Sequence, residues 1–316
     1  MSDKRYNIVF LDRATIGVSV REPKFPHTYK EYQATSPDQV VERLAGAEIA
    51  IINKVPMRAP SLEKLPALKL IAVAATGTDC VDKAYCKAHG ITVSNIRNYA
   101  VNTVPEHTLA LIFALRRSLF PYVLDVRKGK WQTIDQFCYF DHPIRDIAGS
   151  TLGLVGFGAL GKSVATRAEC LGMKVITTDV FDFPGKVDLD TILTQSDVIS
   201  LHCPLTDGTR NMIGAAEFKK MKKDAILINT ARGGLVDEKA LVEALRSGEI
   251  AGAGFDVLSV EPPKNGNVLL DANLPNLIIT PHVAWASVEA MTGLANQLVD
   301  NIEAWVAGKP RNVIID

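Results

Sequence analysis

Short apolar segments that alternate with helical segments between residues 151 and 280 constrain the fold more than any other feature of the sequence. A helix is predicted over 159–171, and another from the N-cap Asp237 to Arg246, closed by Gly248. Strands that alternate with helices of this length predict a parallel, doubly wound α/β sheet. The strands are predicted at 151–155, 174–179, 197–202, 225–229, 251–257 and 277–280.

The first hundred residues predict a second, smaller α/β unit. A helix begins near Val104 with Pro105 in its first turn, where helices favour proline, and its apolar body predicts a buried link between the units. A last helix over 287–307 is expected to return to the first unit. The strands of this unit are predicted at 6–11, 47–52 and 70–74. The predicted domains are residues 100–286 and a discontinuous domain of residues 1–99 and 287–316.

Composition excludes several classes of protein. The 316 residues are too many for one small core and fit two domains, and a hydrophobic fraction of 47% excludes a disordered chain. The formal net charge is zero and basic residues do not cluster, which predicts no nucleic-acid or membrane partner. The polar start is unlike a signal peptide, and the longest apolar run, 109–115, is too short to span a bilayer.

The cysteines bear on redox compartment and metal binding. Five cysteines are an odd number, and they are scattered without a Cys-x-x-Cys pair. This pattern argues against a disulfide framework or a zinc site and fits a reducing compartment. We therefore expect a cytoplasmic protein that needs no metal.

The segment TLGLVGFGALG at 151–161 places Gly-x-Gly-x-x-Gly between a predicted strand and a predicted helix. Gly156 permits the tight turn, Gly158 lets a pyrophosphate approach the backbone, and Gly161 lets helix and strand pack closely. The helix N-terminus offers free N–H groups and a positive dipole end to the phosphates. Asp179 ends the next strand, where a carboxylate binds both ribose hydroxyls of NAD and repels the 2′-phosphate of NADP. The motif predicts NAD as the cofactor.

Three polar residues, Arg232, Glu261 and His282, each follow a different predicted strand. Ligands bind beyond the carboxyl ends of the strands in doubly wound sheets, so we expect these residues to converge at one edge. Taken singly, each has an ordinary structural explanation: a paired arginine, a solvated loop glutamate or a satisfied core histidine.

Together the three side chains form one chemical set. An arginine can hold a carboxylate through two hydrogen bonds, and a histidine can exchange the proton of a carbonyl/hydroxyl couple. A glutamate on the other ring nitrogen orients the imidazole and favours its charged form. Beside a nicotinamide, this set predicts hydride transfer between a 2-oxo acid and a 2-hydroxy acid.

With these residues in place, the chain resembles the D-isomer-specific 2-hydroxyacid dehydrogenase family across nearly its whole length. Besides the glycine motif, the resemblance rests on AATGTD at 74–79, NTARGGLVD at 229–237, DVLSVEP at 256–262 and PHVA at 281–284. It implies two Rossmann-like doubly wound domains, of which the discontinuous substrate domain is flavodoxin-like. It also implies a cleft that closes on binding and a homodimer built largely through the region after Val104.

The resemblance implies roles for individual residues. Arg232, Glu261 and His282 form the implied catalytic triad, and Thr76 and Gly77 are implied to hold the substrate carboxylate with backbone N–H groups. Asp256 is implied to lie near the nicotinamide amide. The expected NAD-binding residues are Gly156, Gly158, Ala159, Leu160, Gly161, Asp179, Cys203, Pro204, Thr209, Thr230, Ala231, Arg232, Asp256 and His282.

Within the family, PHVAWAS at 281–287 and FCYFDHP at 137–143 are most similar to the branch that acts on glycerate and hydroxypyruvate. This similarity predicts NADH-dependent reduction of hydroxypyruvate to D-glycerate, and the reverse. Trp285 is expected to shape the substrate pocket, with packing in the last helix as its alternative. Cys80 stands where relatives often carry asparagine, and a buried small residue is its ordinary explanation.

Two alternative functions stay open. One keeps the fold and changes the main substrate to another small 2-oxo acid, such as glyoxylate or pyruvate. The other is a catalytically weak NAD-sensing binding protein, against which the intact set of arginine, glutamate and histidine argues.

Overall fold

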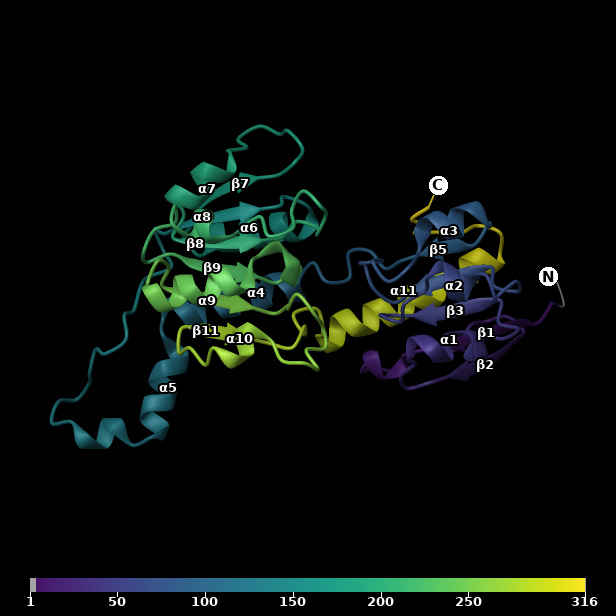
Figure 1. Ribbon diagram of the computed structural model, residues 1–316, viewed down its shortest axis with the longest axis horizontal. Helices are drawn as coiled ribbons and strands as arrows, with labels where there is room; N and C mark the ends of the chain where they lie inside the picture. The colour runs from purple at the N-terminus through teal and green to yellow at the C-terminus, as the bar shows by residue number, and fades with distance from the viewer. Residues whose placement is uncertain (1–3, 316) are drawn as a thin grey trace. The chain divides into compact units, whose positions relative to one another are not determined.

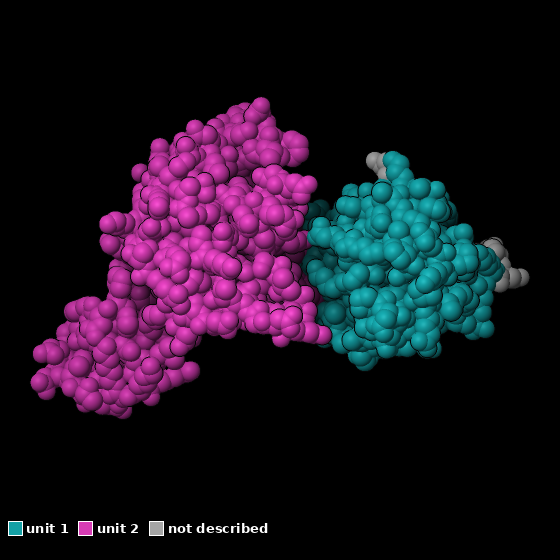
Figure 2. All heavy atoms as spheres, in the orientation of Figure 1, with its two compact units in different colours: residues 1–99, 286–316 teal, residues 100–285 magenta. Residues whose placement is uncertain are grey.

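The computed structural model describes residues 4–315, and the chain divides into two compact units (Figures 1 and 2). Unit 1 comprises residues 1–99 and 286–316, and unit 2 comprises residues 100–285. The predicted second boundary was one residue later, after 286. Each unit is built on its own parallel sheet, so the α/β fold class is confirmed.

Unit 1 contains a five-stranded parallel sheet in the order β2-β1-β3-β4-β5, which is the flavodoxin-like order. Its strands are β1 (Tyr6–Phe10), β2 (His27–Glu31), β3 (Ile49–Ile52), β4 (Leu70–Val73) and β5 (Thr92–Ser94). Its helices are α1 (Val40–Arg43), α2 (Ala59–Leu62), α3 (Lys83–Ala88) and α11 (Val288–Val306), with short 3-10 turns η1 (Arg13–Thr15) and η2 (Pro37–Gln39). The sequence analysis missed β2 and β5. The residues of β2, HTYKE, are mostly exposed at the sheet edge, and the three residues of β5 are too few to show a period.

Unit 2 contains a six-stranded parallel sheet in the order β11-β10-β9-β8-β6-β7. Its strands are β6 (Thr151–Val155), β7 (Lys174–Thr178), β8 (Val198–Leu201), β9 (Ile226–Asn229), β10 (Gly252–Phe255) and β11 (Leu277–Ile279). Its helices are α4 (Thr103–Arg116), α5 (Leu119–Arg127), α6 (Ala159–Cys170), α7 (Leu189–Gln195), α8 (Ala215–Phe218), α9 (Glu238–Ser247) and α10 (Val268–Asp271), with 3-10 turns η3 (Lys130–Thr133) and η4 (Gly233–Leu235). All six predicted strands are present, each within two residues of its predicted limits.

The outer edge of this sheet carries the remnant of one more strand. Thr177 of β7 forms an isolated parallel bridge with Lys186, and the Val187 N–H donates to the Thr177 carbonyl at 2.9 Å. With this bridge counted as one more strand, the strand order becomes that of a Rossmann domain. Successive strands are added on one side of β6 as far as the bridge, and from β8 onward they are added on the other side. That reversal opens a crevice at the carboxyl ends of the two strands, where the glycine motif lies.

Helix α5 departs from the layered body of unit 2. In Figure 1, α5 and the η3 turn project away from the sheet of this unit. Large apolar side chains are exposed on this projection: Leu119, Phe120, Val123, Val126 and Trp131. No helix of residues 4–315 combines the length and the apolar character that crossing a membrane requires.

Gly153 in β6 shows how closely α7 packs on the unit 2 sheet. A Cβ atom at this position would lie 2.2 Å from Ser196 Oγ and 2.8 Å from Ile192 Cγ2. Both neighbours are fully buried, so neither has room to give way. In contrast, Gly293 in α11 is exposed, and a Cβ there would meet no atom within 4 Å.

We expect the substitutions Gly153→Ala and Gly293→Ala to change stability in opposite directions. Overpacking at Gly153 should destabilise the fold by about 1–3 kcal/mol. Alanine at Gly293 should stabilise the fold by roughly 0.5–1 kcal/mol, because glycine is a poor helix former. Thermal unfolding midpoints of the two variants check this, and an unchanged midpoint for Gly153→Ala would contradict the packing argument.

Candidate active site

The glycine turn after β6 has the geometry of a dinucleotide-binding loop. Gly156 has a φ of +100°, and a Cβ there would lie 2.6 Å from the backbone nitrogen of Cys203. A Cβ on Gly161 would lie 2.2 Å from the Gly156 carbonyl oxygen, so this glycine packs helix against turn. A Cβ on Gly158 would meet no atom within 4 Å, which leaves open space at the N-terminus of α6. A pyrophosphate fits that space and the helix dipole behind it.

Asp179 lies at the mouth of the same turn. Its Oδ2 accepts the Phe157 N–H at 2.6 Å, and its Oδ1 accepts the Val180 N–H at 2.7 Å. Each oxygen retains acceptor capacity for a ribose hydroxyl. Val180 and Phe181, which follow, are 80% and 77% exposed and carry no charge to meet a 2′-phosphate. The residues of this turn therefore fit NAD.

The loop after β8 is held by its own polar side chains. The Thr209 hydroxyl donates to the Pro204 carbonyl at 2.8 Å and accepts the Thr206 N–H at 2.8 Å. Burial raises the pKa of Cys203 to about 11, so this residue is a neutral thiol rather than a nucleophile at neutral pH. Burial also lowers the pKa of His202 to about 4, which keeps that ring uncharged.

Thr230 differs from its neighbours in the expected NAD set, because its hydroxyl faces the core. The Thr230 and Thr108 hydroxyl oxygens lie 3.1 Å apart, where α4 passes under the sheet. The adjacent Ala231 N–H donates to Asn229 Oδ1 at 3.1 Å.

Glu261 and His282 form a hydrogen-bonded pair. His282 Nδ1 lies 2.5 Å from Glu261 Oε2, and Glu261 Oε1 accepts the Leu258 N–H at 2.8 Å. The glutamate is thereby fixed by the backbone before it, and the imidazole is fixed by the glutamate. This arrangement leaves Nε2 as the ring nitrogen available to a reacting molecule. Both side chains are partly exposed and border a pocket of about 340 Å³.

Asp256 holds the loop that carries His282. The Asp256 carboxylate, 1% exposed, accepts the Thr280 hydroxyl at 2.5 Å and the N–H groups of Val283 and Ala284 at 2.9 and 2.8 Å. Its carbonyl accepts the His282 N–H at 2.8 Å. His282 has a φ of +56°, which is uncommon outside glycine, so the loop needs such anchors.

His107 of α4 completes this arrangement. Its Nε2 lies 2.9 Å from Thr280 Oγ1, and because that hydroxyl donates to Asp256, the histidine nitrogen must be the donor. The sequence gives no signal for this contact, since the two residues are 173 positions apart.

Arg232 is positioned by a fully buried asparagine that sequence reasoning missed. Asn229 Nδ2 donates to the Arg232 carbonyl at 2.9 Å, and Asn229 is 0% exposed. A Cβ at Gly233 would lie 1.9 Å from the carbonyl carbon of Leu258, so the loops after β9 and β10 touch. The arginine therefore lies on the same edge of the sheet as Glu261.

The remaining predicted substrate residues lie in both units. In unit 2, the Trp285 Nε1–H donates to the His282 carbonyl at 3.0 Å, which attaches the indole to the histidine loop. In unit 1, the loop after β4 carries Thr76, whose hydroxyl donates to the Ile96 carbonyl at 2.7 Å. Burial raises the pKa of the Cys80 thiol, which lies 3.8 Å from the Asn53 carbonyl oxygen. No group of three or more potential metal ligands occurs in the described part of the chain.

Comparisons with known proteins agree with this geometry. Over 308 residues the chain is 69% identical to a glycerate dehydrogenase of Methylorubrum extorquens, covering 97% of this chain and 98% of that protein. It is 37% identical over 293 residues to a hydroxypyruvate reductase of Blautia hydrogenotrophica, covering 90% of each. The structure of a D-lactate dehydrogenase from Aquifex aeolicus, complexed with NAD and lactic acid, matches with a TM-score of 0.81 at 30% identity, covering 98% of this chain and 99% of that chain.

The family itself follows from the match over most of unit 2. Residues 109–284 match the description "D-isomer specific 2-hydroxyacid dehydrogenase, NAD binding domain". This match confirms the resemblance inferred from the motifs, and the full-length relatives extend it to unit 1. The chain therefore belongs to the D-isomer-specific 2-hydroxyacid dehydrogenases and is an NAD-dependent oxidoreductase of that family.

Proposed function

We propose that the protein reduces hydroxypyruvate to D-glycerate with NADH, and catalyses the reverse reaction. The observation that carries the chemistry is the 2.5 Å contact between His282 and Glu261, beyond the carboxyl ends of a dinucleotide-binding sheet. The 69% identity to a glycerate dehydrogenase supports this choice of substrate.

In the proposed mechanism, the side chains of the chain bind the acid and move one proton. The bound nicotinamide supplies or accepts the hydride at the carbon that carries the oxygen. His282 donates a proton from Nε2 to the carbonyl oxygen during reduction and recovers it during oxidation. Glu261 accepts the Nδ1–H, which orients the ring and stabilises its positive charge. Arg232 and the N–H groups of Thr76 and Gly77 hold the substrate carboxylate, and Trp285 borders the substrate.

We expect His282→Asn to lower kcat by about 10²–10⁴-fold, the range of general acid–base catalysis. Asparagine tolerates the positive φ at this position, so the loop should keep its backbone. Affinity for NADH, measured by fluorescence titration, should be unchanged, and Glu261→Gln should give a smaller loss in the same direction. The assay follows NADH absorbance with hydroxypyruvate, with His89→Asn as the control for an exposed histidine. Full turnover by His282→Asn would refute the assigned role.

The preference for NADH over NADPH is also a proposal, supported by Asp179 and the uncharged residues after it. We expect Asp179→Ser to lower kcat/KM with NADH and to raise the ratio of NADPH to NADH activity, because the charge that repels a 2′-phosphate is removed.

A matched control comes from the same turn. Gly158→Ala should weaken both nucleotides equally and leave the unfolding midpoint unchanged, since its Cβ enters only open space. An unchanged nucleotide ratio in Asp179→Ser would contradict the assignment.

Two other functions remain as outcomes of the same assay. Faster turnover of glyoxylate or pyruvate than of hydroxypyruvate would keep the mechanism and change the substrate. NADH binding without turnover of any 2-oxo acid would favour an NAD-sensing protein, although the hydrogen-bonded Glu261–His282 pair supports the catalytic function.

We further propose a homodimer built through α5 and the η3 turn. The exposed apolar residues of this projection support it, because contiguous apolar surface commonly marks an interface. Analytical ultracentrifugation should give a species of twice the 34.3 kDa chain mass. Val123→Asp should convert it to monomer, while Val180→Asp, at an exposed valine elsewhere, should not. A monomeric wild type would refute the proposal.

A cytoplasmic location remains a prediction. It is supported by the five cysteines, all of which are free thiols.

A further inference from the structure

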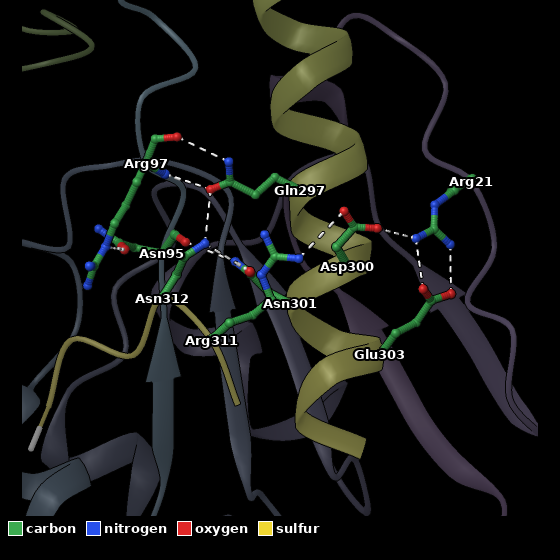
Figure 3. A network of polar contacts seen from close by, with 9 residues as sticks. All are labelled: Arg21, Asn95, Arg97, Gln297, Asp300, Asn301, Glu303, Arg311 and Asn312. Atoms are coloured by element: carbon green, nitrogen blue, oxygen red, sulfur yellow. Dashed lines mark hydrogen bonds and ion pairs between the residues drawn. The ribbon is translucent and has the colours of Figure 1, made fainter. Parts of the chain in front are cut away.

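A set of amide side chains in unit 1 joins α11 to the loop that follows β5 (Figure 3), and one of them, Asn95, reaches the loop that follows β4. Its centre is Asn301, which is 1% exposed. Asn301 Nδ2 donates to the Asn95 carbonyl at 2.9 Å, and its Oδ1 accepts Asn312 Nδ2 at 3.0 Å. Buried polar groups whose hydrogen bonds are all made specify one arrangement of the elements they join. The helix is therefore fixed in register against the end of β5.

Asn95 also connects the β5 loop to Thr76 in the loop after β4. The Asn95 N–H donates to the Asn312 carbonyl at 3.1 Å, and its side-chain Nδ2 donates to the Thr76 carbonyl at 2.9 Å. The Thr76 hydroxyl donates to the Ile96 carbonyl at 2.7 Å. Both the carbonyl and the hydroxyl of Thr76 are thus directed toward the β5 loop.

Gln297 and Arg97 add a second tie between α11 and the same loop. The Arg97 N–H donates to Gln297 Oε1 at 2.7 Å, and Gln297 Nε2 donates to the Arg97 carbonyl at 3.1 Å. Arg97 Nη2 also donates to the Val313 carbonyl at 3.0 Å, which attaches the segment after α11. The β5 loop is therefore held from two sides.

This arrangement leaves the backbone donors of the β4 loop for another partner. Within residues 4–315, no acceptor is hydrogen-bonded to the N–H groups of Thr76 or Gly77. The Gly77 N–H lies in the same planar peptide as the Thr76 carbonyl, so the hydrogen bond from Asn95 fixes the direction of that N–H. The Ile96 N–H, in the β5 loop, fixes the Thr76 N–H in the same way through the Ala75 carbonyl at 3.0 Å. Successive backbone N–H groups in a turn form sites that bind anions. We propose that Asn95 and Asn301 are positioning residues, which set the direction of these N–H groups and thereby the affinity for the substrate carboxylate. This inference rests on the carboxylate-binding role of Thr76 and Gly77 proposed above.

Arg21 offers a matched control on the other side of the same helix (Figure 3). It forms ion pairs with Asp300 at 2.6 Å and Glu303 at 2.7 Å, and it has no hydrogen bond to the β4 or β5 loop. Arg21→Gln should therefore loosen α11 without redirecting the N–H groups of Thr76 and Gly77.

The test compares KM and kcat in the full-length enzyme, with hydroxypyruvate or whichever 2-oxo acid the wild type turns over. We expect Asn95→Ala and Asn301→Leu to raise KM about tenfold or more, with kcat within about twofold, because carboxylate binding contributes equally to ground and transition states. NADH affinity should be unchanged.

Arg21→Gln should lower the unfolding midpoint and leave KM unchanged. Asn312→Gly, which keeps the φ of 55° and the carbonyl, is the milder variant should the others not fold, and should raise KM severalfold.

Two results would overturn the inference. One is an unchanged KM in the asparagine variants, and the other is a KM increase of equal size in Arg21→Gln. Arg232→Gln separates this failure from that of the proposed function. If Arg232→Gln raises KM and the asparagine variants do not, only the positioning role is wrong. If none of these variants changes KM, the proposed carboxylate site is wrong as well.

Discussion

The buried carboxylate of Asp256 is the interaction on which the candidate active site of unit 2 depends. Removing a carboxylate from water is costly unless donors replace the water, and here one hydroxyl and two backbone N–H groups do so. Hydrogen bonds to a charged group contribute about 1.5–3 kcal/mol each, enough to offset the roughly 1–2 kcal/mol of a left-handed residue at His282. The left-handed backbone at His282 places the imidazole against Glu261, and the Asp256 carboxylate holds the loop in that conformation.

Unit 1 uses the same device at its own strand ends. Asp12, 5% exposed, accepts the N–H groups of Asn53 and Lys54 at 2.8 and 2.7 Å and so fixes the loop after β3. Burial raises the pKa of Asp12, while those N–H groups oppose the shift. Asn95 and Asn229 fix neighbouring loops with neutral amides. In each case a short buried polar side chain at the end of a strand, or just beyond it, holds a neighbouring loop.

The sequence predicted the parts of the fold that are encoded locally. The strands of unit 2 were predictable because each is a compact apolar run, and the glycine turn was predictable because its spacing follows from backbone geometry. By contrast, α5 was missed, since its exposed apolar face does not resemble the stripe of a helix packed on a sheet. The sequence also indicated that a glutamate would orient His282, but only the structure gives their 2.5 Å contact.

The polar supports were not predictable, because their partners are distant in the sequence. Asp256 joins residues 24 to 28 positions away, and Asn301 joins a residue 206 positions away. A buried asparagine or aspartate has the same letter as an exposed one, and its function depends on which backbone groups the fold brings to it.

Two glycines of the glycine turn, Gly158 and Gly161, differ in what a side chain would meet. At Gly161 a side chain would collide with the turn itself, whereas at Gly158, three residues earlier, it would enter empty space. A library of variants sorted only for folded protein would therefore retain many residues at 158 and reject them at 161. With the role proposed above for Gly158, sorting for nucleotide binding would reject them at both positions. The two glycines of one motif thus differ in their surroundings: Gly161 is required for the turn to pack, whereas the packing of the fold does not require glycine at 158.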